Sequence, residues 1–543
     1  MRLACGLAVL TALAACGHRD RGTSSDAVTL KFAYSSEKKA WLDQAIPAFL
    51  ATHPTTPSGK PIKVDARSFG SGEAQAAILN GTFKAHVYSP ASSAYLALLD
   101  RDSKRAKRLA PTSEPLVLSP IVIAMWKPMA EALGWPGKDI GWADIVKVAK
   151  DPRGWAAFGH PEWGAFKLGH THPEFSNSGL LSILAETFAA AKKTRGLTRA
   201  DVESPATREY LTSIEGAIVH YGKSTGLFTD QMIAHGPSYM SAAVTYENLV
   251  IESYAHQAQF PLVAVYPVEG TFWSDHPYAI LDAEWVGADE RAAGEQLLAF
   301  LKSKPQQAAA QALGFRPADP AIATAAPVDT LHGVDPKQPS TTLEVPNADV
   351  LGALLGVWHD LKKTADVTIV FDRSGSMNGN PLDEAKAGAR AFVNGLGDRD
   401  SLSILFFDNN VPTPPPPQPL QGARGVLLAQ IDNVVADGGT SLYDAVAATY
   451  VMMLARAKSD PTKIHAIVVM TDGKDESSTR TTLDQLNTLL ASDSAPVKIF
   501  TIAYGDAADP AVLDSIASAA QGTSVKGSVE TIVQIYQDLS AFF

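Results

Sequence analysis

A cluster of oxygen-bearing side chains follows an apolar run in the last third of the chain. Residues 367–371 read Val-Thr-Ile-Val-Phe, which is typical of a strand buried on both faces of a parallel sheet. Asp372, Ser374 and Ser376 come directly after this run, and a helical pattern begins near Leu382. Open α/β sheets bind their ligands at the carboxyl ends of the strands. One carboxylate and two hydroxyls at such an edge are hard oxygen ligands of the kind that Mg²⁺ prefers.

Two later stretches supply oxygen atoms at the same edge of the predicted sheet. Thr440 precedes a helical run that starts at Leu442, and Asp472 follows a second buried-strand run, residues 464–470. Alone, the pattern Asp-x-Ser-x-Ser is weak, because Asp, Ser and Gly are common in ordinary turns. Three oxygen-bearing loops in one βα domain favour a metal site over the alternative, in which these residues serve only as turn and capping residues.

The stretches VTIVFDRSGSM, GGTSLYDAV and IVVMTDGKDES resemble the metal-ion-dependent adhesion site of von Willebrand factor A (VWA) domains. The resemblance implies a doubly wound, Rossmann-like domain over residues 349–543. It also implies a bound Mg²⁺ (or Mn²⁺ or Ca²⁺), held directly or through water, whose last ligand is an acidic group of a protein partner. All five positions of that site are filled here, so the resemblance assigns the metal-binding role to Asp372, Ser374, Ser376, Thr440 and Asp472.

The composition is that of a folded, acidic chain with more than one domain. A length of 543 residues predicts two or three domains, and 46% hydrophobic with 19% charged residues is typical of globular proteins. The formal net charge of −11 argues against nucleic acid as a partner. Beyond the N-terminus, no stretch is apolar for long enough to cross a bilayer.

The first residues resemble a bacterial lipoprotein signal. A short apolar stretch ends in Leu-Ala-Ala-Cys at 13–16, which resembles a lipobox cleaved before Cys16. The chain has two cysteines, and Cys5 lies in the removed segment, so Cys16 has no partner for a disulfide within the chain. Lipidation would explain its presence. The alternative is an ordinary secretory signal of similar length. We expect a signal peptide at 1–15, a tether at 16–27, and a lipid anchor in a membrane of the bacterial cell envelope.

From residue 28 onward, strand and helix patterns alternate, and loops rich in Ser and Gly connect them. One strand candidate ends at residues 35–36, a second is followed by residues 68–72, and a third ends at Ser89. Each loop precedes a helical pattern, so several helix N-termini would meet at one sheet edge. Their backbone N–H groups and the nearby hydroxyls could hold an anion there. A later helix starts at residues 177–179, in a Trp-rich region that we interpret as a second lobe.

The order of these segments resembles extracytoplasmic solute-binding proteins of the two-lobed, type II kind. The resemblance covers about residues 28–320 and is carried by FAYSSEKKAWLDQAIPAF, SFGSGEAQAAIL, FKLGHTHPEFSNSGLL, YPVEGTFWSDHPYAIL and KPQQAAAQALGFRP. Such proteins bind small solutes between the lobes, and serines and helix N-termini hold oxyanions in some of them. Carried to this chain, the candidates are Ser35, Ser36, Gly70, Ser71, Ser89, Asn177 and Ser178. The alternative is that each caps a helix and touches no ligand.

Together the patterns predict an α/β protein with a two-lobed periplasmic-binding-protein-like domain at 28–322, a linker at 323–348 and a VWA domain. We expect a membrane-anchored extracytoplasmic binding protein that combines a metal-dependent protein-interaction module with a module for a small solute, for which an oxyanion is one candidate. The alternative is the substrate-binding component of an ABC-type transporter, with the VWA domain as a docking module. No catalysis is expected, since Asp372-x-Ser374 lacks the second aspartate of a phosphatase-type motif and no G-x-S-x-G, Walker or H-E-x-x-H sequence occurs.

Overall fold

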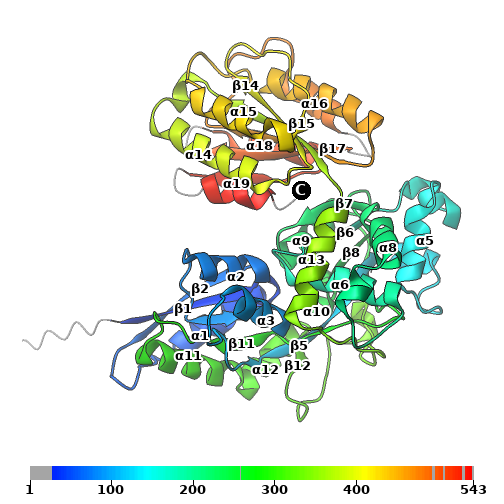
Figure 1. The fold of residues 1–543 in the computed structure, drawn as a ribbon, viewed down its shortest axis with the longest axis vertical. Helices are drawn as coiled ribbons and strands as arrows, with labels where there is room; N and C mark the ends of the chain where they lie inside the picture. Colours follow the sequence, from blue (N-terminus) through cyan, green and yellow to red (C-terminus); the bar gives the residue numbers. More distant parts are fainter. Residues whose placement is uncertain (1–26, 257, 492–495, 506–507, 529–531, 541–543) are drawn as a thin grey trace, which may run out of the picture.

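The computed structural model describes residues 27–543, apart from 257, 492–495, 506–507, 529–531 and 541–543. The predicted signal peptide, Cys16 and almost all of the tether therefore lie outside the described residues. Figure 1 shows two lobes in colours from blue to green, and a third unit in colours from yellow-green to red. None of the helices in the described ranges is long and apolar enough to cross a membrane.

The first lobe is built around five strands. Its elements are β1 (Val28–Ser35), η1 (Ser36–Lys38), α1 (Lys39–Leu50), β2 (Ile62–Phe69), α2 (Ser71–Asn80), β3 (Val87–Ser89), α3 (Ser93–Asp102), β4 (Glu114–Pro115), β11 (Pro277–Ile280), α11 (Ala288–Leu301) and α12 (Lys304–Ala312). The strand order is β2-β1-β3-β11-β4, and β1 pairs in parallel with β2 and β3. The loops after these three strands consequently meet at one edge, as the alternating pattern predicted. Phe32 of β1 packs in one core with Trp41 of α1 and Leu297 of α11.

The second lobe has a mixed sheet surrounded by helices. Its elements are β5 (Val117–Trp126), α4 (Lys127–Ala132), α5 (Trp142–Lys150), η2 (Gly154–Phe158), η3 (Pro161–Trp163), β6 (Leu168–Thr171), α6 (Asn177–Ala191), α7 (Arg199–Val202), α8 (Pro205–Glu215), β7 (Ile218–Gly222), α9 (Thr225–His235), β8 (Ala242–Tyr246), α10 (Glu247–Glu252), η4 (Ser253–Ala255), β9 (Leu262–Val265), β10 (Trp273–Ser274) and β12 (Arg316–Pro317). The order is β10-β5-β8-β6-β7, with β9 and β12 also paired to β5. Trp142 and Trp155 are fully buried, so they fill the core of this lobe.

The segment before the third unit contains η5 (Thr330–His332) and α13 (Ala348–Leu361). Helix α13 packs against α6, α7 and α8 of the second lobe and against α3 of the first. Arg101 of α3 donates a hydrogen bond to the carbonyl of Ala348 (2.7 Å). At the other end of α13, Trp358 Nε1 donates to Glu215 Oε1 of the second lobe (2.9 Å). The helix that leads into the third unit is thus held by both lobes.

The third unit is a sheet with helices on both faces. Its elements are β13 (Ala365–Asp372), η6 (Gly375–Met377), α14 (Asn380–Gly395), β14 (Ser401–Phe407), β15 (Gln418–Pro419), α15 (Leu420–Asn433), α16 (Leu442–Ser459), β16 (Ile464–Thr471), α17 (Leu483–Leu490), β17 (Val497–Tyr504), α18 (Pro510–Ala519), β18 (Ser524–Gly527) and α19 (Ile532–Ser540). The order is β15-β14-β13-β16-β17-β18, and only β15 is antiparallel to its neighbour. Strands β13, β16 and β17 are buried along their whole length, because α14, α15 and α19 cover one face and α16, α17 and α18 the other.

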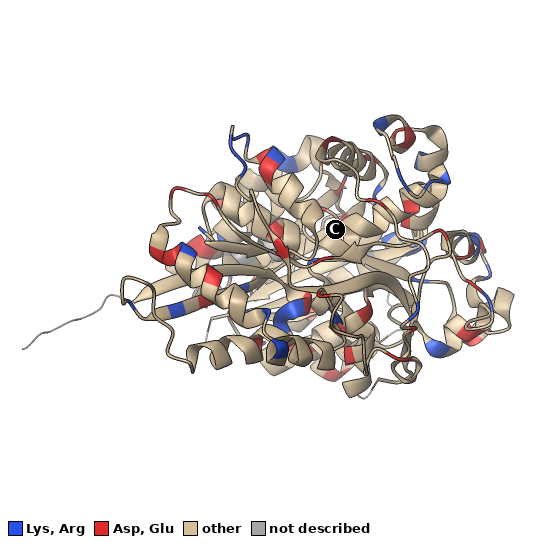
Figure 2. Ribbon diagram, turned by 90° about the horizontal axis from the view of Figure 1, so that it is seen from below, with Lys and Arg blue, Asp and Glu red and all other residues tan. Residues whose placement is uncertain are grey.

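Charged residues of both signs are interspersed over the outer helices and loops, while the strands are drawn mainly in tan (Figure 2). Burying a charge is costly unless a partner compensates it. The few charged side chains that lie inside the molecule, among them Glu37, Lys38, Asp372, Asp472 and Lys498, therefore indicate where ligands or internal ion pairs are to be sought.

Candidate metal and solute sites

Four of the five predicted metal ligands lie within hydrogen-bond distance of one another at the carboxyl edge of the third sheet. Asp372 ends β13, and Asp472 follows the neighbouring strand β16. Ser374 Oγ and Ser376 Oγ are 3.0 Å apart, and Ser376 Oγ donates to Asp472 Oδ1 (2.8 Å). Residues almost a hundred positions apart in the chain are thus in direct contact, because parallel strands end at the same edge.

The fifth residue, Thr440, reaches the same place from the loop before α16. A Cβ atom added at Gly473 would lie 3.2 Å from Thr440 Oγ1 and 3.9 Å from Ser376 Oγ, so these two hydroxyls flank the same glycine. The N–H of Gly375 donates to the carbonyl of Gly438 (2.9 Å), which ties the two loops together. We call the set Asp372, Ser374, Ser376, Thr440 and Asp472 the oxygen rim.

The oxygen rim concentrates negative charge that the protein itself does not balance. Asp372 is fully buried, and it accepts hydrogen bonds from the N–H of Ser374 (2.8 Å) and from Thr471 Oγ1. Burial raises the pKa of Asp372 to about 6, and burial also raises the pKa of Asp472. Within the described part of the chain, neither carboxylate forms an ion pair. Since Ser376 is exposed, a cation has access to the rim from solvent, and two carboxylates with three hydroxyls fit a hard divalent ion.

A second polar cluster lies between the two lobes, and its charges are paired internally. In the first lobe, Lys38 Nζ contacts Ser35 Oγ, Glu37 Oε1 (3.3 Å) and the carbonyl of Pro90 (3.3 Å). The imidazole Nδ1 of His276 lies 3.1 Å from Glu37 Oε1 and 3.3 Å from Lys38 Nζ. Burial alone would raise the pKa of Glu37, but Lys38 and His276 lower it below its ordinary value. The carboxylate is therefore held in its charged form by the protein's own cation.

The second lobe contributes uncharged donors and acceptors to this cluster. Asn177 Nδ2, at the start of α6, donates to Tyr246 OH (3.0 Å) and to Ser274 Oγ (3.3 Å). Ser178 Oγ lies 2.8 Å from Thr225 Oγ1, at the start of α9. We call the combined set the interlobe network, which consists of Ser35, Glu37, Lys38, Ser89, Asn177, Ser178, Thr225, Tyr246, Ser274 and His276.

Several polar atoms in or beside the interlobe network are buried without a hydrogen-bond partner among the described residues. They are Ser89 Oγ, Asn177 Oδ1, Ser224 Oγ and His276 Nε2. The ring of Tyr246 packs edge-on against that of His276, with centroids 5.6 Å apart, which joins the two halves of the network. An unsatisfied buried polar atom costs free energy, and a polar ligand would recover it.

Two of the predicted solute ligands use their hydroxyls differently. Ser36 Oγ accepts a hydrogen bond from the N–H of Gly226 in the other lobe (3.2 Å). Ser71 Oγ accepts from the N–H of Ala91 within its own lobe (3.1 Å). Both residues lie near the contact between the lobes, but neither belongs to the interlobe network.

At the N-terminus of α2 the two lobes are in direct backbone contact. The N–H of Gly72 donates to the carbonyl of Phe175 in the second lobe (2.9 Å). A Cβ atom at Gly70 would lie 2.3 Å from Phe175 O, and one at Gly72 would lie 1.7 Å from Glu174 O. Only glycine permits this approach. The helix donors that were predicted to hold an oxyanion are here satisfied by a carbonyl, so the structure represents a closed arrangement of the lobes.

Six of the ten residues of the interlobe network were not among the predicted solute ligands. Glu37 and Lys38 directly follow Ser35-Ser36, so their position at a strand end was a usable signal. Thr225, Tyr246 and Ser274 carried no such signal, because they lie in the second lobe and meet the network only where the two lobes come together. His276 lies in the segment by which the chain returns to β11 of the first lobe.

Two family profiles match separate parts of the chain. Residues 30–316 match the bacterial extracellular solute-binding proteins, and residues 366–538 match the von Willebrand factor type A domain. The chain is thus an α/β protein that combines a periplasmic-binding-protein-like region with a VWA domain, as predicted. Since the first match spans more than half of the chain, the protein belongs to the bacterial extracellular solute-binding protein family. Both families are typically non-enzymatic.

Individual relatives are similar over parts of the chain. An uncharacterised protein of Synechocystis sp. is 28% identical over 187 residues, which make up 34% of this chain and only 43% of that relative. A von Willebrand factor type A protein from Catenulispora acidiphila is 21% identical, covers 33% of this chain and 43% of its own, and has a TM-score of 0.30. A periplasmic thiamin-binding protein is 13% identical, covers 62% of this chain and 96% of its own, and has a TM-score of 0.44.

Proposed function

We propose that this protein is an extracytoplasmic binding protein with two separate sites, a divalent-cation site at the oxygen rim and a small-solute site at the interlobe network. The observation that carries the proposal is the contrast in charge between them. The rim gathers two carboxylates and three hydroxyls without a cation of its own, whereas the network pairs its carboxylate with Lys38. The domain limits 28–322 and 349–543 are part of this proposal.

At the oxygen rim, Asp372, Ser374, Ser376, Thr440 and Asp472 would hold Mg²⁺ or Mn²⁺. When bound, such an ion supplies an electrophilic centre that can accept an acidic group of a partner protein as a further ligand. The protein's own contribution is positional. The hydrogen bonds from Ser374 N–H and Thr471 Oγ1 fix the Asp372 carboxylate, and the exposed Ser376 marks the side from which a partner would approach.

Calorimetric titration of the full chain with Mg²⁺ and with Mn²⁺ tests the metal site. We expect binding by the wild type and none by Asp372→Ala. The matched control is Asp484→Ala, which removes an exposed carboxylate of the same domain and should leave the titration unchanged. Equal binding by Asp372→Ala and the wild type would remove the metal from the proposal.

The interlobe network would bind a small polar solute between the lobes. It offers an amide, several hydroxyls and an imidazole from both lobes, and its internal ion pair leaves it without a large net charge. We expect a thermal-shift screen of polar metabolites and oxyanions to identify a solute that stabilises the full chain, by about 2.7 kcal/mol at a hundredfold excess over Kd. Asn177→Ala should lose the response, and Gln44→Ala, which removes an exposed amide, should keep it. If no solute in a broad screen stabilises the wild type, this half of the proposal fails.

The location and the transport alternative can be tested in cells. We propose that Cys16 carries the lipid that anchors the protein to the envelope. Cys16→Ser should then move from the membrane fraction to the soluble fraction, and a variant that still pellets with membranes would contradict the anchor. The match to solute-binding proteins supports the alternative of an ABC-type transport component, which neighbouring genes for permease subunits would favour.

A further inference from the structure

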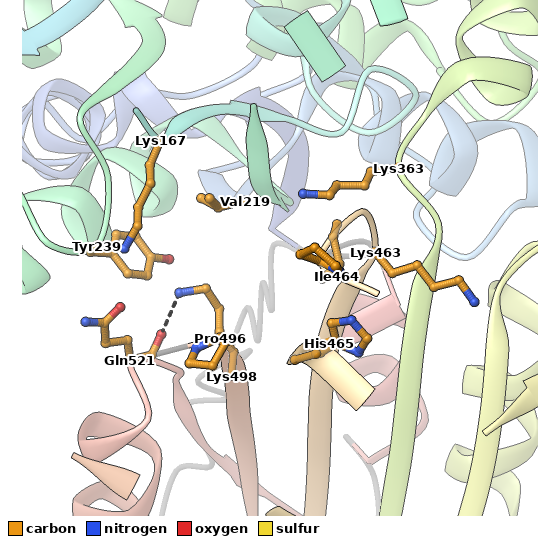
Figure 3. A pocket seen from close by; sticks show the side chains of 12 residues that line it. Lys167, Val219, Tyr239, Lys363, Lys463, Ile464, His465, Pro496, Lys498 and Gln521 are labelled. Carbon is orange, nitrogen blue, oxygen red and sulfur yellow. Dashed lines mark hydrogen bonds between the residues drawn. The ribbon is translucent and has the colours of Figure 1, made fainter. Parts of the chain in front are cut away.

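A cavity of about 170 Å³ lies between the second lobe and the VWA domain (Figure 3). The second lobe contributes Lys167 and Tyr239 to its walls, and the VWA domain contributes His465 and Lys498. Lys363, in the short connection between α13 and β13, lies between the two. Basic side chains from both sides of a domain interface therefore line one small space.

Three of the four lysines that line the cavity extend toward its interior, and we call Lys167, Lys363 and Lys498 the lysine cavity. In Figure 3 the nitrogen atoms of these three residues lie around the open space, while the side chain of Lys463 extends away from it. Lys463 is also paired, since its Nζ lies 3.0 Å from Asp366 Oδ1. It is consequently not part of the proposed site.

The three ammonium groups have few contacts that compensate their charge. Among the described residues, none of them lies within ion-pair distance of a carboxylate, and each donates only to a backbone carbonyl. These contacts are Lys167 to Ser238, Lys363 to Ile218 (3.2 Å) and Lys498 to Gln521 (3.4 Å). Taking an ammonium group out of water without an anion costs free energy, so an arrangement of this kind favours an external anion.

Lys498 is the most constrained member of the lysine cavity. Its side chain is buried, and its Nζ lies 4.2 Å from the centre of the Tyr239 ring. Burial, and to a lesser extent the charge of Lys167, lower the pKa of Lys498 to about 7. Burial also lowers the pKa of Lys363, which Glu215 and Asp460 raise only in part. Like charges thus destabilise one another across this interface.

We propose that the lysine cavity binds a small divalent oxyanion, such as phosphate or sulfate, which holds the second lobe and the VWA domain together. The size of the cavity suits a single tetrahedral oxyanion. Three ammonium donors match an ion with more than one negative charge. His465 lies at the wall as well, but its Nδ1 lies 3.9 Å from Asp366 Oδ2 and its Nε2 contacts the carbonyl of Asp460 (2.8 Å), so it does not belong to the lysine cavity.

The lysine cavity is separate from the oxygen rim and from the interlobe network. His465 and Lys498 lie in the first two residues of β16 and β17, whereas the rim follows the last residue of β16. An eight-residue strand places these two edges of the sheet roughly 25 Å apart. The anion site therefore goes beyond the proposed metal and solute sites, and it stands or falls independently of them.

Thermal-shift titration of the metal-free full chain with inorganic phosphate, against sodium chloride at equal ionic strength, tests the proposal. We expect phosphate to raise the melting temperature of the wild type, and sulfate to act in the same way. Lys498→Met and Lys363→Met should each weaken phosphate binding by at least about tenfold, which is about 1.4 kcal/mol. Lys526→Met and Lys150→Met remove exposed lysines from the VWA domain and the second lobe, and both should respond like the wild type.

A second measurement avoids dependence on the variants. Acetic anhydride labelling of the wild type, read by mass spectrometry, should show Lys498 protected by phosphate and not by chloride, while Lys526 is labelled equally in both. Asn177→Ala, which lacks the proposed solute site, should keep the protection. The proposal is overturned if phosphate stabilises no more than chloride does, if the two cavity variants bind phosphate as tightly as the wild type, or if Lys498 is labelled equally with both anions.

Discussion

The oxygen rim and the interlobe network treat buried charge in opposite ways. At the rim, Asp372 and Asp472 have no basic partner among the described residues, and burial raises the pKa of both. In the network, Glu37 is as deeply buried as Asp372, but Lys38 and His276 lower its pKa. The comparison teaches that the rim leaves its two carboxylates unbalanced, which is why we propose a cation ligand there, whereas the network pairs its own charges and offers hydrogen bonds instead.

The largest expected effect comes from removing the internal cation of the interlobe network. Lys38→Met leaves Glu37 buried without its partner, so we expect the free energy of unfolding to fall by about 3–5 kcal/mol. Urea denaturation of the full chain, followed by fluorescence, measures the change in its first transition. The control is Lys39→Met, which breaks the exposed pair with Asp43 and should cost no more than about 0.5 kcal/mol. Similar losses for both variants would contradict the comparison.

A third buried carboxylate tests the cost of an uncompensated charge away from either site. Burial raises the pKa of Glu186 from 4.5 to about 7, while His170 lowers it and Glu215 raises it. The pKa of Glu186 is higher in the folded than in the unfolded state. The contribution of this residue to stability is therefore fully present below pH 4.5 and is lost as the pH rises through 7. Glu186→Gln should therefore be more stable than the wild type at pH 8, by at most about 3 kcal/mol.

The advantage of Glu186→Gln should disappear at pH 4, where both side chains are neutral. Thermal unfolding at pH 4, 6 and 8 measures this profile, and Glu295→Gln, which changes an exposed glutamate, is the control. A variant whose melting temperature differs from that of the wild type by the same amount at every pH would show that Glu186 does not titrate as expected.

Lobe closure distinguishes the two sites, because only the solute site is formed by two lobes. Gly72→Ala places a Cβ atom 1.7 Å from the carbonyl oxygen of Glu174, so the closed arrangement cannot form without a shift. We expect at least about tenfold weaker binding of the solute and unchanged titration with Mg²⁺. The control is Gly356→Ala, because Gly356 lies in helix α13 and an added Cβ atom there would meet no atom within 4 Å. Gly81 is unsuitable because its φ is positive. Equal solute affinity for Gly72→Ala and the wild type would show that solute binding does not depend on closure of the lobes.

The smallest effect is expected from neutralising one carboxylate of the metal-free rim. Asp472→Asn keeps an oxygen that can accept the hydrogen bond from Ser376 Oγ, so the free energy of unfolding without metal should change by less than about 1 kcal/mol. Its affinity for Mn²⁺ should nevertheless fall by at least about tenfold. A loss of stability comparable to that of Lys38→Met would show that the rim is a structural cluster and not a ligand site.

The sequence predicted the rim better than the solute site for a physical reason. Asp372, Ser374 and Ser376 are local in sequence, and the buried strands beside them set a sheet edge that also fixes the place of Asp472. The interlobe network depends on where the chain returns after long excursions, which no local pattern encodes. Helix α13 illustrates the same limit, since no local pattern in residues 348–361 indicates that two lobes would share it.

That shared helix has a consequence for the whole molecule. If the lobes separate to admit a solute, α13 cannot keep both Arg101 at Ala348 and Trp358 at Glu215, because these contacts belong to different lobes. The backbone N–H of Lys363, two residues after α13, is hydrogen-bonded to Tyr221 OH of the second lobe (3.2 Å), so the Arg101 contact is the one expected to break. The VWA domain would then move together with the second lobe. The orientation of the oxygen rim relative to the first lobe would therefore differ between the solute-free and the solute-bound protein.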